Sequence, residues 1–309
     1  MPPLICIMQK RRESEMGSKR VIEFEVTEEY DGGAVSDILR GALHMSGTLV
    51  KELKEYNDGI TVNGNRARTV DRVKAGDTVR AAIRDGASEN IVPRDMELDI
   101  VYEDEDVLVV NKPGGMPTHP SAGHLDDTLA NGIAAHYLTK GEEHVFRAVN
   151  RLDKDTSGLM CVAKHSYAHT RLIEQLHGGG LERGYLAIVT GRLDGAGTID
   201  APIARESFLK RTVRADGKRA VTHYTAVAYG HGCTLVRLAL ETGRTHQIRV
   251  HMAHIGHPLL GDWLYGEEDK MRFPRQALHS ERLSFIHPVT GERLSFTAEL
   301  PEDMKKLME

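Results

Sequence analysis

The densest group of reactive side chains in the 309-residue sequence is the segment Asn150-Arg-Leu-Asp-Lys-Asp-Thr-Ser-Gly158. It lies between apolar stretches that predict strands, and polar loops on a rigid sheet are common places for catalytic groups. Within it, Asp153 stands close to Arg151 and Lys154, and nearby positive charge keeps a carboxylate ionised. An ionised aspartate can act as a nucleophile or a base, although this local pattern is also typical of an exposed ion pair.

Two other chemistries fit this segment less well. Asp153, Asp155, Ser157 and Gly158 match the first positions of a calcium-binding loop, but Lys164 occupies the twelfth position, where the ion needs a glutamate. The same run also approaches the D-x-D-x-T motif of aspartyl-phosphate phosphatases. The alternating α/β pattern that should follow that motif is missing from the sequence. We therefore predict no metal in this segment.

A second cluster contains the four histidines His246, His251, His254 and His257. Histidines three or four apart on a helix can share a metal ion, but neither an HExxH motif nor an acidic third ligand accompanies them. We predict instead an ordinary helix with Thr245 as its N-cap and with His246 and Arg249 on one face. Its apolar stripe would be formed by Ile248, Met252 and Ile255.

The elements that must position these groups are mostly strands. Buried strands are predicted over residues 98–102, 107–110, 158–163, 185–189, 220–229, 233–240, 281–285 and 293–297. Helices are predicted over 129–137, behind Thr128, and over 167–177, ahead of the stop at residues 178–180. Because short turns join several of the strands, the sequence favours an α+β fold on a mixed, largely antiparallel sheet.

The N-terminal part predicts a separate small unit. Residues 1–20 are interpreted as a flexible extension and residues 85–95 (DGASENIVPRD) as a linker. Between them, residues 21–84 predict a strand, two helices over 35–42 and 48–56, and a hairpin with strands at 59–64 and 78–83. Ser46 is the candidate cap of the second helix. The catalytic domain would then occupy residues 96–309.

Charge distinguishes parts of the chain. Its 40 Lys+Arg and 45 Asp+Glu residues give a net charge of -5, which argues against a wholly polybasic coat for nucleic acid. Residues 40–84 nevertheless contain nine basic and five acidic side chains, which favours local contacts with phosphates. The loop from Arg205 to Arg219 has six basic and two acidic side chains and is interpreted as a clamp on an RNA backbone. Trp263 and Tyr265 are expected to pack as core or wall residues.

Other features limit the class of protein. No apolar run approaches the roughly 20 residues that cross a bilayer, so we expect no membrane contact. The three cysteines, Cys6, Cys161 and Cys233, lack the spacing of a disulfide framework or a thiolate zinc site. We expect a cytoplasmic monomer that needs no cofactor, since no cofactor motif is present.

Four segments together resemble the RluA-type pseudouridine synthases, which act on large-subunit ribosomal RNA or transfer RNA. Residues 151–159 (RLDKDTSGL) are similar to the family signature, and residues 111–120 (NKPGGMPTHP) to the loop after its second strand. Residues 182–187 (ERGYLA) match the segment with the active-site tyrosine. Residues 242–251 (TGRTHQIRVH), continuing to Asp262, match the third motif. Residues 33–84 likewise resemble the alpha-L RNA-binding module.

The resemblance spans about residues 98–299 of the catalytic domain and implies a role for each matched residue. Asp153 would be the catalytic carboxylate, which either attacks the ribose carbon or removes a ribose proton. Tyr185 would stack on the uracil or act as a base, and Arg249 would pair with Asp153. Arg151 would fill the space left by the extruded nucleotide, since a base must leave its stack to be reached. One position departs from the family: Asn150 stands where many members have histidine.

The implied function is the site-specific isomerisation of uridine to pseudouridine in structured RNA, without a metal or cofactor. A different class, a non-catalytic RNA-binding or assembly factor, could share this fold, but the intact Asp153, Tyr185 and Arg249 argue against it. A phosphohydrolase would require a metal ion, so activity in the presence of a chelator would separate it from the other two.

Overall fold

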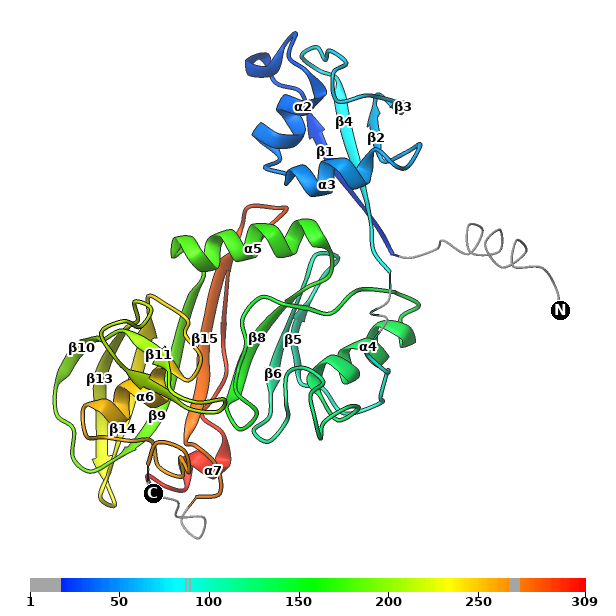
Figure 1. The fold of residues 1–309 in the computed structure, drawn as a ribbon. Helices are drawn as coiled ribbons and strands as arrows, with labels where there is room; N and C mark the ends of the chain where they lie inside the picture. The colour runs from blue at the N-terminus through cyan, green and yellow to red at the C-terminus, as the bar shows by residue number, and fades with distance from the viewer. Residues whose placement is uncertain (1–17, 87, 89, 267–272) are drawn as a thin grey trace.

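The computed structural model describes residues 18–86, 88, 90–266 and 273–309, which form a small and a large sheet, each with its own apolar core (Figure 1). The predicted N-terminal extension lies outside the described residues up to residue 17. Its last two residues, Lys19 and Arg20, are not part of an extension, because they begin the first strand.

The small unit is a four-stranded antiparallel sheet of order β1-β4-β2-β3, covered by short helices. Ser46 caps α3 as predicted, since its Oγ accepts a hydrogen bond from the Leu49 N–H at 3.1 Å. The helix predicted over 35–42 is only partly α-helical, because it widens into a π-helical turn at Ile38. The elements are β1 (Lys19–Glu25), η1 (Glu28–Tyr30), α2 (Val35–Asp37), η2 (Ile38–Ala42), α3 (Gly47–Leu53), β2 (Ile60–Val62), β3 (Asn65–Arg66) and β4 (Thr78–Arg84).

The large sheet has the order β10-β13-β14-β9-β15-β8-β6-β5, with β16 and β7 paired beside β15 and β8. Only the β15–β8 pair among these is parallel, so the predicted mixed, largely antiparallel sheet is confirmed. Its strands are β5 (Ile100–Glu103), β6 (Val107–Lys112), β7 (Arg147–Ala148), β8 (Ser157–Ala163), β9 (Glu182–Thr190), β10 (Ala196–Asp200), β13 (Val221–Gly230), β14 (Cys233–Leu240), β15 (Leu278–Ile286) and β16 (Arg293–Thr297).

Helices cover both faces of this sheet, which explains why strands such as β6 and β8 are almost entirely buried. Strand β8 is buried at every residue. Met160 and Val162 pack on the side of α4 (Leu129–Thr139) and α6 (Gln247–His254). Leu159 and Cys161 pack on the side of α5 (Ser166–Gly178). A short helix, α7 (Glu302–Lys305), follows the last strand.

A separate hairpin, β11 (Ile203–Arg205) and β12 (Arg211–Val213), includes the first half of the basic loop of residues 205–219, which was predicted to be a connection between strands. Its tip is apolar and exposed, with Phe208 82% and Leu209 56% accessible. The guanidinium of Arg205 lies 5.5 Å from the centre of the Phe208 ring.

Ion pairs and one apolar side chain attach the small unit to the large one. Arg20 donates two hydrogen bonds to Asp106, at 2.8 and 3.1 Å, and Arg147 pairs with Asp85, from its Nη2 at 2.8 Å. Tyr167, on α5, is buried in the core of the small unit. The segment predicted as a linker has no helix or strand in its described residues, and its Asp85 is buried in this contact.

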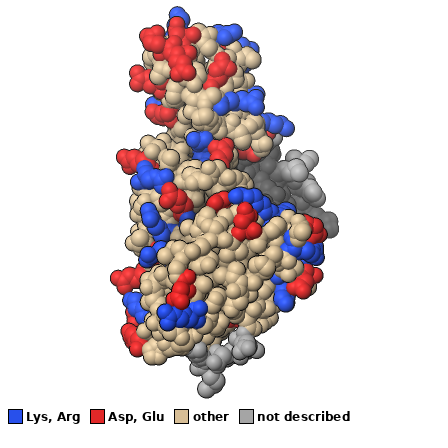
Figure 2. Space-filling view, turned by 90° about the vertical axis from the view of Figure 1, so that its left-hand side faces the viewer, with Lys and Arg blue, Asp and Glu red and all other residues tan. Residues whose placement is uncertain are grey.

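Basic and acidic side chains are interspersed on the face of the molecule shown in Figure 2, which agrees with the small net charge. Among the described residues, no helix is both long and apolar enough to span a bilayer.

Candidate active site

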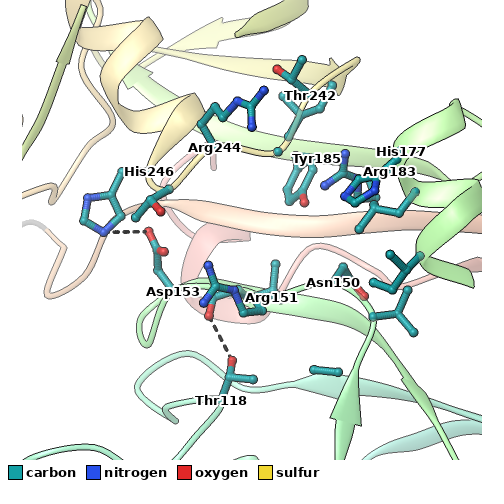
Figure 3. A pocket seen from close by; sticks show the side chains of 18 of the residues that line it. Thr118, Asn150, Arg151, Asp153, His177, Arg183, Tyr185, Thr242, Arg244 and His246 are labelled. Atoms are coloured by element: carbon teal, nitrogen blue, oxygen red, sulfur yellow. Dashed lines mark hydrogen bonds and ion pairs between the residues drawn. The ribbon is translucent and has the colours of Figure 1, made fainter. Parts of the chain in front are cut away.

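Asp153 lies at the centre of the site, in the loop before β8, with its side chain 29% exposed (Figure 3). The Arg249 Nη1 donates a hydrogen bond to its Oδ2 at 3.0 Å. No hydrogen bond to the other oxygen, Oδ1, occurs within the described part of the chain. Asp153 and Arg249 are therefore paired, as predicted. The second carboxylate oxygen has no hydrogen-bond donor among the described residues.

Arg249 is itself fixed by a second carboxylate, which the sequence did not identify. Its Nε and Nη2 donate to Asp262 at 2.7 and 2.8 Å, and Asp262 is fully buried. Burial alone would lower the pKa of the guanidinium, but Asp262 and Asp153 outweigh this effect and raise the pKa above its usual value. Arg249 therefore stays charged and can orient Asp153 with a rigid planar fork.

Side chains from the loop of residues 111–120 hold the backbone on either side of Asp153. The Thr118 hydroxyl donates to the Leu152 carbonyl at 3.0 Å (Figure 3). Lys112, at the end of β6, is fully buried, and its Nζ donates to the carbonyls of Pro113, Met116 and Lys154 at 2.8 to 2.9 Å. Burial lowers the pKa of Lys112 to about 7, whereas three carbonyl acceptors match the three N–H groups of the ammonium form.

We expect Lys112→Met to destabilise the protein by about 2 kcal/mol, because it leaves three carbonyls without their buried donor. Activity should fall as well, since the Lys154 carbonyl is next to Asp153. Urea denaturation followed by circular dichroism measures the first effect. Lys54→Met, at an exposed position of the small unit, is the matched control and should change stability by less than about 0.5 kcal/mol. Equal stability of the two variants would contradict the bracing role of Lys112.

Gly158 is required where the Asp153 loop enters the sheet. Its φ of +113° lies in a region that favours glycine. A Cβ at this position would lie 2.3 Å from the Ser280 carbonyl oxygen, because β8 and β15 run side by side here. The glycine at the end of the RLDKDTSG segment is therefore a requirement of the sheet.

A cavity of about 770 Å³ opens beside Asp153, large enough for a nucleotide. Tyr185, from β9, and Arg151 line it together with Asp153, so the structure brings three of the four predicted site residues to its wall (Figure 3). Tyr185 is buried, which raises the pKa of its phenol, whereas Arg151 is exposed. The fourth, Arg249, does not line this cavity, but it lines a smaller adjoining pocket together with the other three. The cavity is further lined by Thr118, Asn150, His177, Arg183, Thr242, Arg244 and His246.

Asn150, the residue that departs from the family pattern, supports the backbone. Its Oδ1 accepts a hydrogen bond from the Cys161 N–H at 2.8 Å, and its Nδ2 donates to the Leu159 carbonyl at 3.3 Å. Both partners are in β8, and Asn150 is 3% exposed. Its amide thus ties the start of the loop to the strand at its end.

The helix of the third motif differs in its start from the prediction. Thr245 is not its N-cap. The N-cap of α6 is His246, whose backbone has a left-handed conformation with φ 57° and ψ 21°. This conformation turns the imidazole toward Asp153, with 3.7 Å between His246 Nε2 and Asp153 Oδ2 (Figure 3). His246 and Arg249 do lie on one side, as predicted, because both approach the same carboxylate oxygen.

The four histidines do not gather around one point. His251 bonds to Thr222 and the Ala201 carbonyl, each at 2.9 Å, and His257 bonds to the Thr190 carbonyl at 3.0 Å. These partners belong to different parts of the sheet, so the two rings have structural roles.

Within the described residues, one group has the composition of a metal site: Asp104, Asp106 and His287. The Nδ1 of His287 accepts hydrogen bonds from the N–H groups of Val289 and Thr290, at 3.3 and 3.0 Å. Its proton therefore sits on Nε2, which points at Asp104 from 3.0 Å. An Nε2 that carries a proton has no lone pair for a metal, so this group fits an ion-pair network better than a metal site.

Three basic side chains of the 205–219 loop pair with carboxylates, of which only Glu241 lies outside the loop. Arg214 pairs with Asp216 and Arg219 with Glu241, and Lys210 lies 3.8 Å from Glu206. Trp263 is 51% exposed, so its assignment to the core or a wall was wrong. Tyr265 is partly buried and packs against His246, with 2.9 Å between its hydroxyl and His246 Nδ1.

Asp262, Lys112, Thr118 and His246 are the residues that sequence reasoning missed as parts of the site. All four lie in segments that it had singled out, the loop of residues 111–120 and the third motif. For Lys112, the one signal in the sequence was a lysine at the end of an apolar strand. The contacts of the others depend on residues far away in the sequence.

Comparisons with known proteins show the family to which the chain is similar. Residues 106–254 match the family described as RNA pseudouridylate synthase. The chain is 45% identical over 272 residues to the uncharacterized RNA pseudouridine synthase YjbO of Bacillus subtilis, covering 87% of this chain and 96% of that protein. It is 44% identical to the ribosomal large subunit pseudouridine synthase D of Pseudomonas aeruginosa, over 81% of this chain and 82% of the relative.

Solved structures extend the likeness to the fold. Human RNA pseudouridylate synthase domain containing 1 superposes with a TM-score of 0.56 at 28% identity, covering 66% of this chain and 83% of the other. The human domain containing 4 protein gives 0.54 at 24% identity, over 67% and 90% of the two chains.

Proposed function

This chain belongs to the RNA pseudouridylate synthase family, and from this premise we propose that Asp153 is the residue that carries out the isomerisation. In the reaction, the bond between ribose C1′ and uracil N1 breaks, and the uracil turns. A bond from C1′ to C5 then forms, C5 loses its proton and N1 gains one. Nothing is oxidised, reduced or hydrolysed.

The observation that carries this proposal is the unequal environment of the two oxygens of Asp153. Oδ2 is held by Arg249 at 3.0 Å, whereas Oδ1 has no hydrogen-bond partner within the described chain, and the Asp153 side chain lines the cavity. Attack on the ribose carbon and removal of a ribose proton both need an ionised oxygen with access to the sugar. A carboxylate held through one oxygen presents the other to either route.

Tyr185 and Arg151 complete the proposal. Because burial raises the pKa of Tyr185, its phenol stays protonated near neutral pH. This favours stacking on the uracil over action as a base. Arg151 is exposed at the mouth of the cavity, where its side chain can occupy the stack that the target nucleotide leaves.

We propose ribosomal RNA of the large subunit as the substrate, because the relatives that carry a substrate in their name are large-subunit enzymes at 43 to 48% identity. Pseudouridine mapping of total RNA, with and without this protein, tests this. Sites lost from large-subunit RNA would support it, and sites lost only from transfer RNA would overturn it. We also propose that the protein acts as a monomer in the cytoplasm.

We further propose that the unit of residues 21–84 is the alpha-L RNA-binding module and that the β11–β12 hairpin contacts RNA. Of the nine basic side chains in the module, Arg68, Arg80 and Arg84 pair with carboxylates. Residues 21–39 add six acidic side chains and no basic ones, so the basic surplus is confined to residues 40–84. The other six basic side chains of that part are all exposed: Arg40, Lys51, Lys54, Arg66, Arg72 and Lys74.

The double variant Lys51→Gln, Lys54→Gln should weaken RNA binding and reduce the slope of log K against log salt by about 1 to 2, because fewer counterions are released. Lys305→Gln, Lys306→Gln removes the same charge near the C-terminus and should leave the slope unchanged. Filter binding over a series of salt concentrations measures both. A slope that stays at the parent value in the first variant would contradict RNA binding by α3.

A further inference from the structure

His246 has an unusual backbone and a side chain that the start of α6 does not use. Its φ of 57° places a residue with a Cβ in the left-handed region, which costs about 1 kcal/mol. As the N-cap of α6 it makes no capping hydrogen bond through its side chain. Instead, its Nε2 faces Asp153 Oδ2 at 3.7 Å. Backbone strain of this kind is retained where the surroundings over-determine it, often at functional sites.

A short hydrogen-bonded chain fixes which ring nitrogen of His246 carries the proton. The Tyr265 oxygen accepts a hydrogen bond from the Arg211 N–H at 2.8 Å and lies 2.9 Å from His246 Nδ1. If the hydroxyl donates to Nδ1, the imidazole proton sits on Nε2 and points at Asp153. In the opposite tautomer, the hydroxyl proton has no acceptor within the described residues and a lone pair faces the carboxylate. The first arrangement gives the hydroxyl proton an acceptor and directs Nε2–H toward Asp153 Oδ2, 3.7 Å away.

We propose that His246 is a positioning residue for Asp153, whose Nε2–H approaches Oδ2 because Tyr265 imposes the tautomer. This inference rests on the proposed role of Asp153. His246 Nε2 and Arg249 Nη1 both face Oδ2. Oδ1 is therefore the oxygen that meets the ribose.

The charge state of His246 suits this role. Burial lowers the pKa of its imidazole, and Arg249 and Arg211 lower it further, whereas Asp153 and Asp262 act in the opposite direction. The net effect is a lowered pKa, so the ring is neutral near pH 7. A neutral donor can orient the carboxylate without adding a second positive charge that would weaken its nucleophilicity.

Tyr265→Phe tests the proposal with little disturbance, since it retains the ring over which the Arg249 guanidinium lies, 5.1 Å from the centroid. We expect the single-turnover rate on an RNA transcript to fall about tenfold, while the Kd for the RNA changes less than about twofold. Tyr229→Phe, which removes a hydroxyl from an exposed tyrosine on β13, is the control and should behave like the parent.

Nitrogen-15 NMR of the imidazole provides a readout that does not depend on activity. The parent should show the Nε2–H tautomer of His246, and Tyr265→Phe should show a mixture. In addition, His246→Gln, whose amide can accept from Tyr265 and donate to Asp153, should retain more activity than His246→Leu. A parent in the Nδ1–H tautomer, or Tyr265→Phe at the parental rate, would overturn the inference. If one of these results were obtained while Asp153→Asn was inactive, the inference about His246 would fail and the proposed function of Asp153 would stand.

Discussion

Asp153→Asn should abolish pseudouridine formation in a protein that remains folded. The substitution preserves shape and removes the charge and the reactive oxygen, so neither proposed route can proceed. RNA affinity should stay near the parental value or rise slightly, because a negative charge near phosphates is removed. Product formation on purified protein and thermal unfolding of the same sample measure the two effects.

The structure explains why folding should survive. If Asp153 were the sole partner of Arg249, its neutralisation would leave a buried charge unpaired and cost about 3–5 kcal/mol. Arg249 keeps both of its hydrogen bonds to Asp262 at 2.7 and 2.8 Å, so we expect a change below about 1 kcal/mol. Asp126→Asn makes the same chemical change at an exposed position and should leave activity intact. A folded Asp153→Asn enzyme that still makes pseudouridine would refute the proposed mechanism.

Arg249→Lys should be both inactive and less stable, although the formal charge is unchanged. An ammonium cannot make two parallel bonds to Asp262 and a third to Asp153. Since Asp262 is fully buried, we expect the rate to fall about 100-fold or more and the free energy of unfolding to fall by about 2–3 kcal/mol. Single-turnover kinetics and urea denaturation measure these changes.

Arg237→Lys is the matched control for this variant. Arg237 is exposed, and its contacts with Glu281 are 3.4 and 3.5 Å long, so the same substitution should change stability by less than about 0.5 kcal/mol. An Arg249→Lys enzyme with parental turnover would show that the fork between Asp153 and Asp262 has no role in the reaction.

The sequence predicted β6 and β8 well because these strands are buried on both faces, whereas the short strands β7 and β10 were not predicted. Residues such as Val109 and Val110 face opposite cores, so an apolar run is the only pattern that fits. The start of α6 could not be predicted in the same way. Thr245 is the better cap by residue type, but contacts from Tyr265 and Asp153 hold His246 in the left-handed conformation.

The sequence motifs located the candidate site, but they predicted only some of the contacts within it. The pairing of Asp153 with Arg249 followed from the family resemblance, and the structure contains it. The buried partner Asp262 and the role of Lys112 arise from tertiary contacts, which local patterns do not encode. Likewise, the pairing of Arg219 in the 205–219 loop was not predicted, because Glu241 is separated from Arg219 in sequence and close to it in space.

The attachment of the small unit through Arg20 and Asp106, Asp85 and Arg147, and Tyr167 has a consequence for substrate choice. If both units bind RNA, as proposed, their two surfaces are held at a set separation. Once one surface has bound, the second meets its part of the RNA at a high effective concentration only if the RNA spans the gap between them. An RNA with a matching uridine but a stem of the wrong length gains no such advantage. Selection of the target would then depend on the folded dimensions of the RNA as well as on the sequence around the uridine.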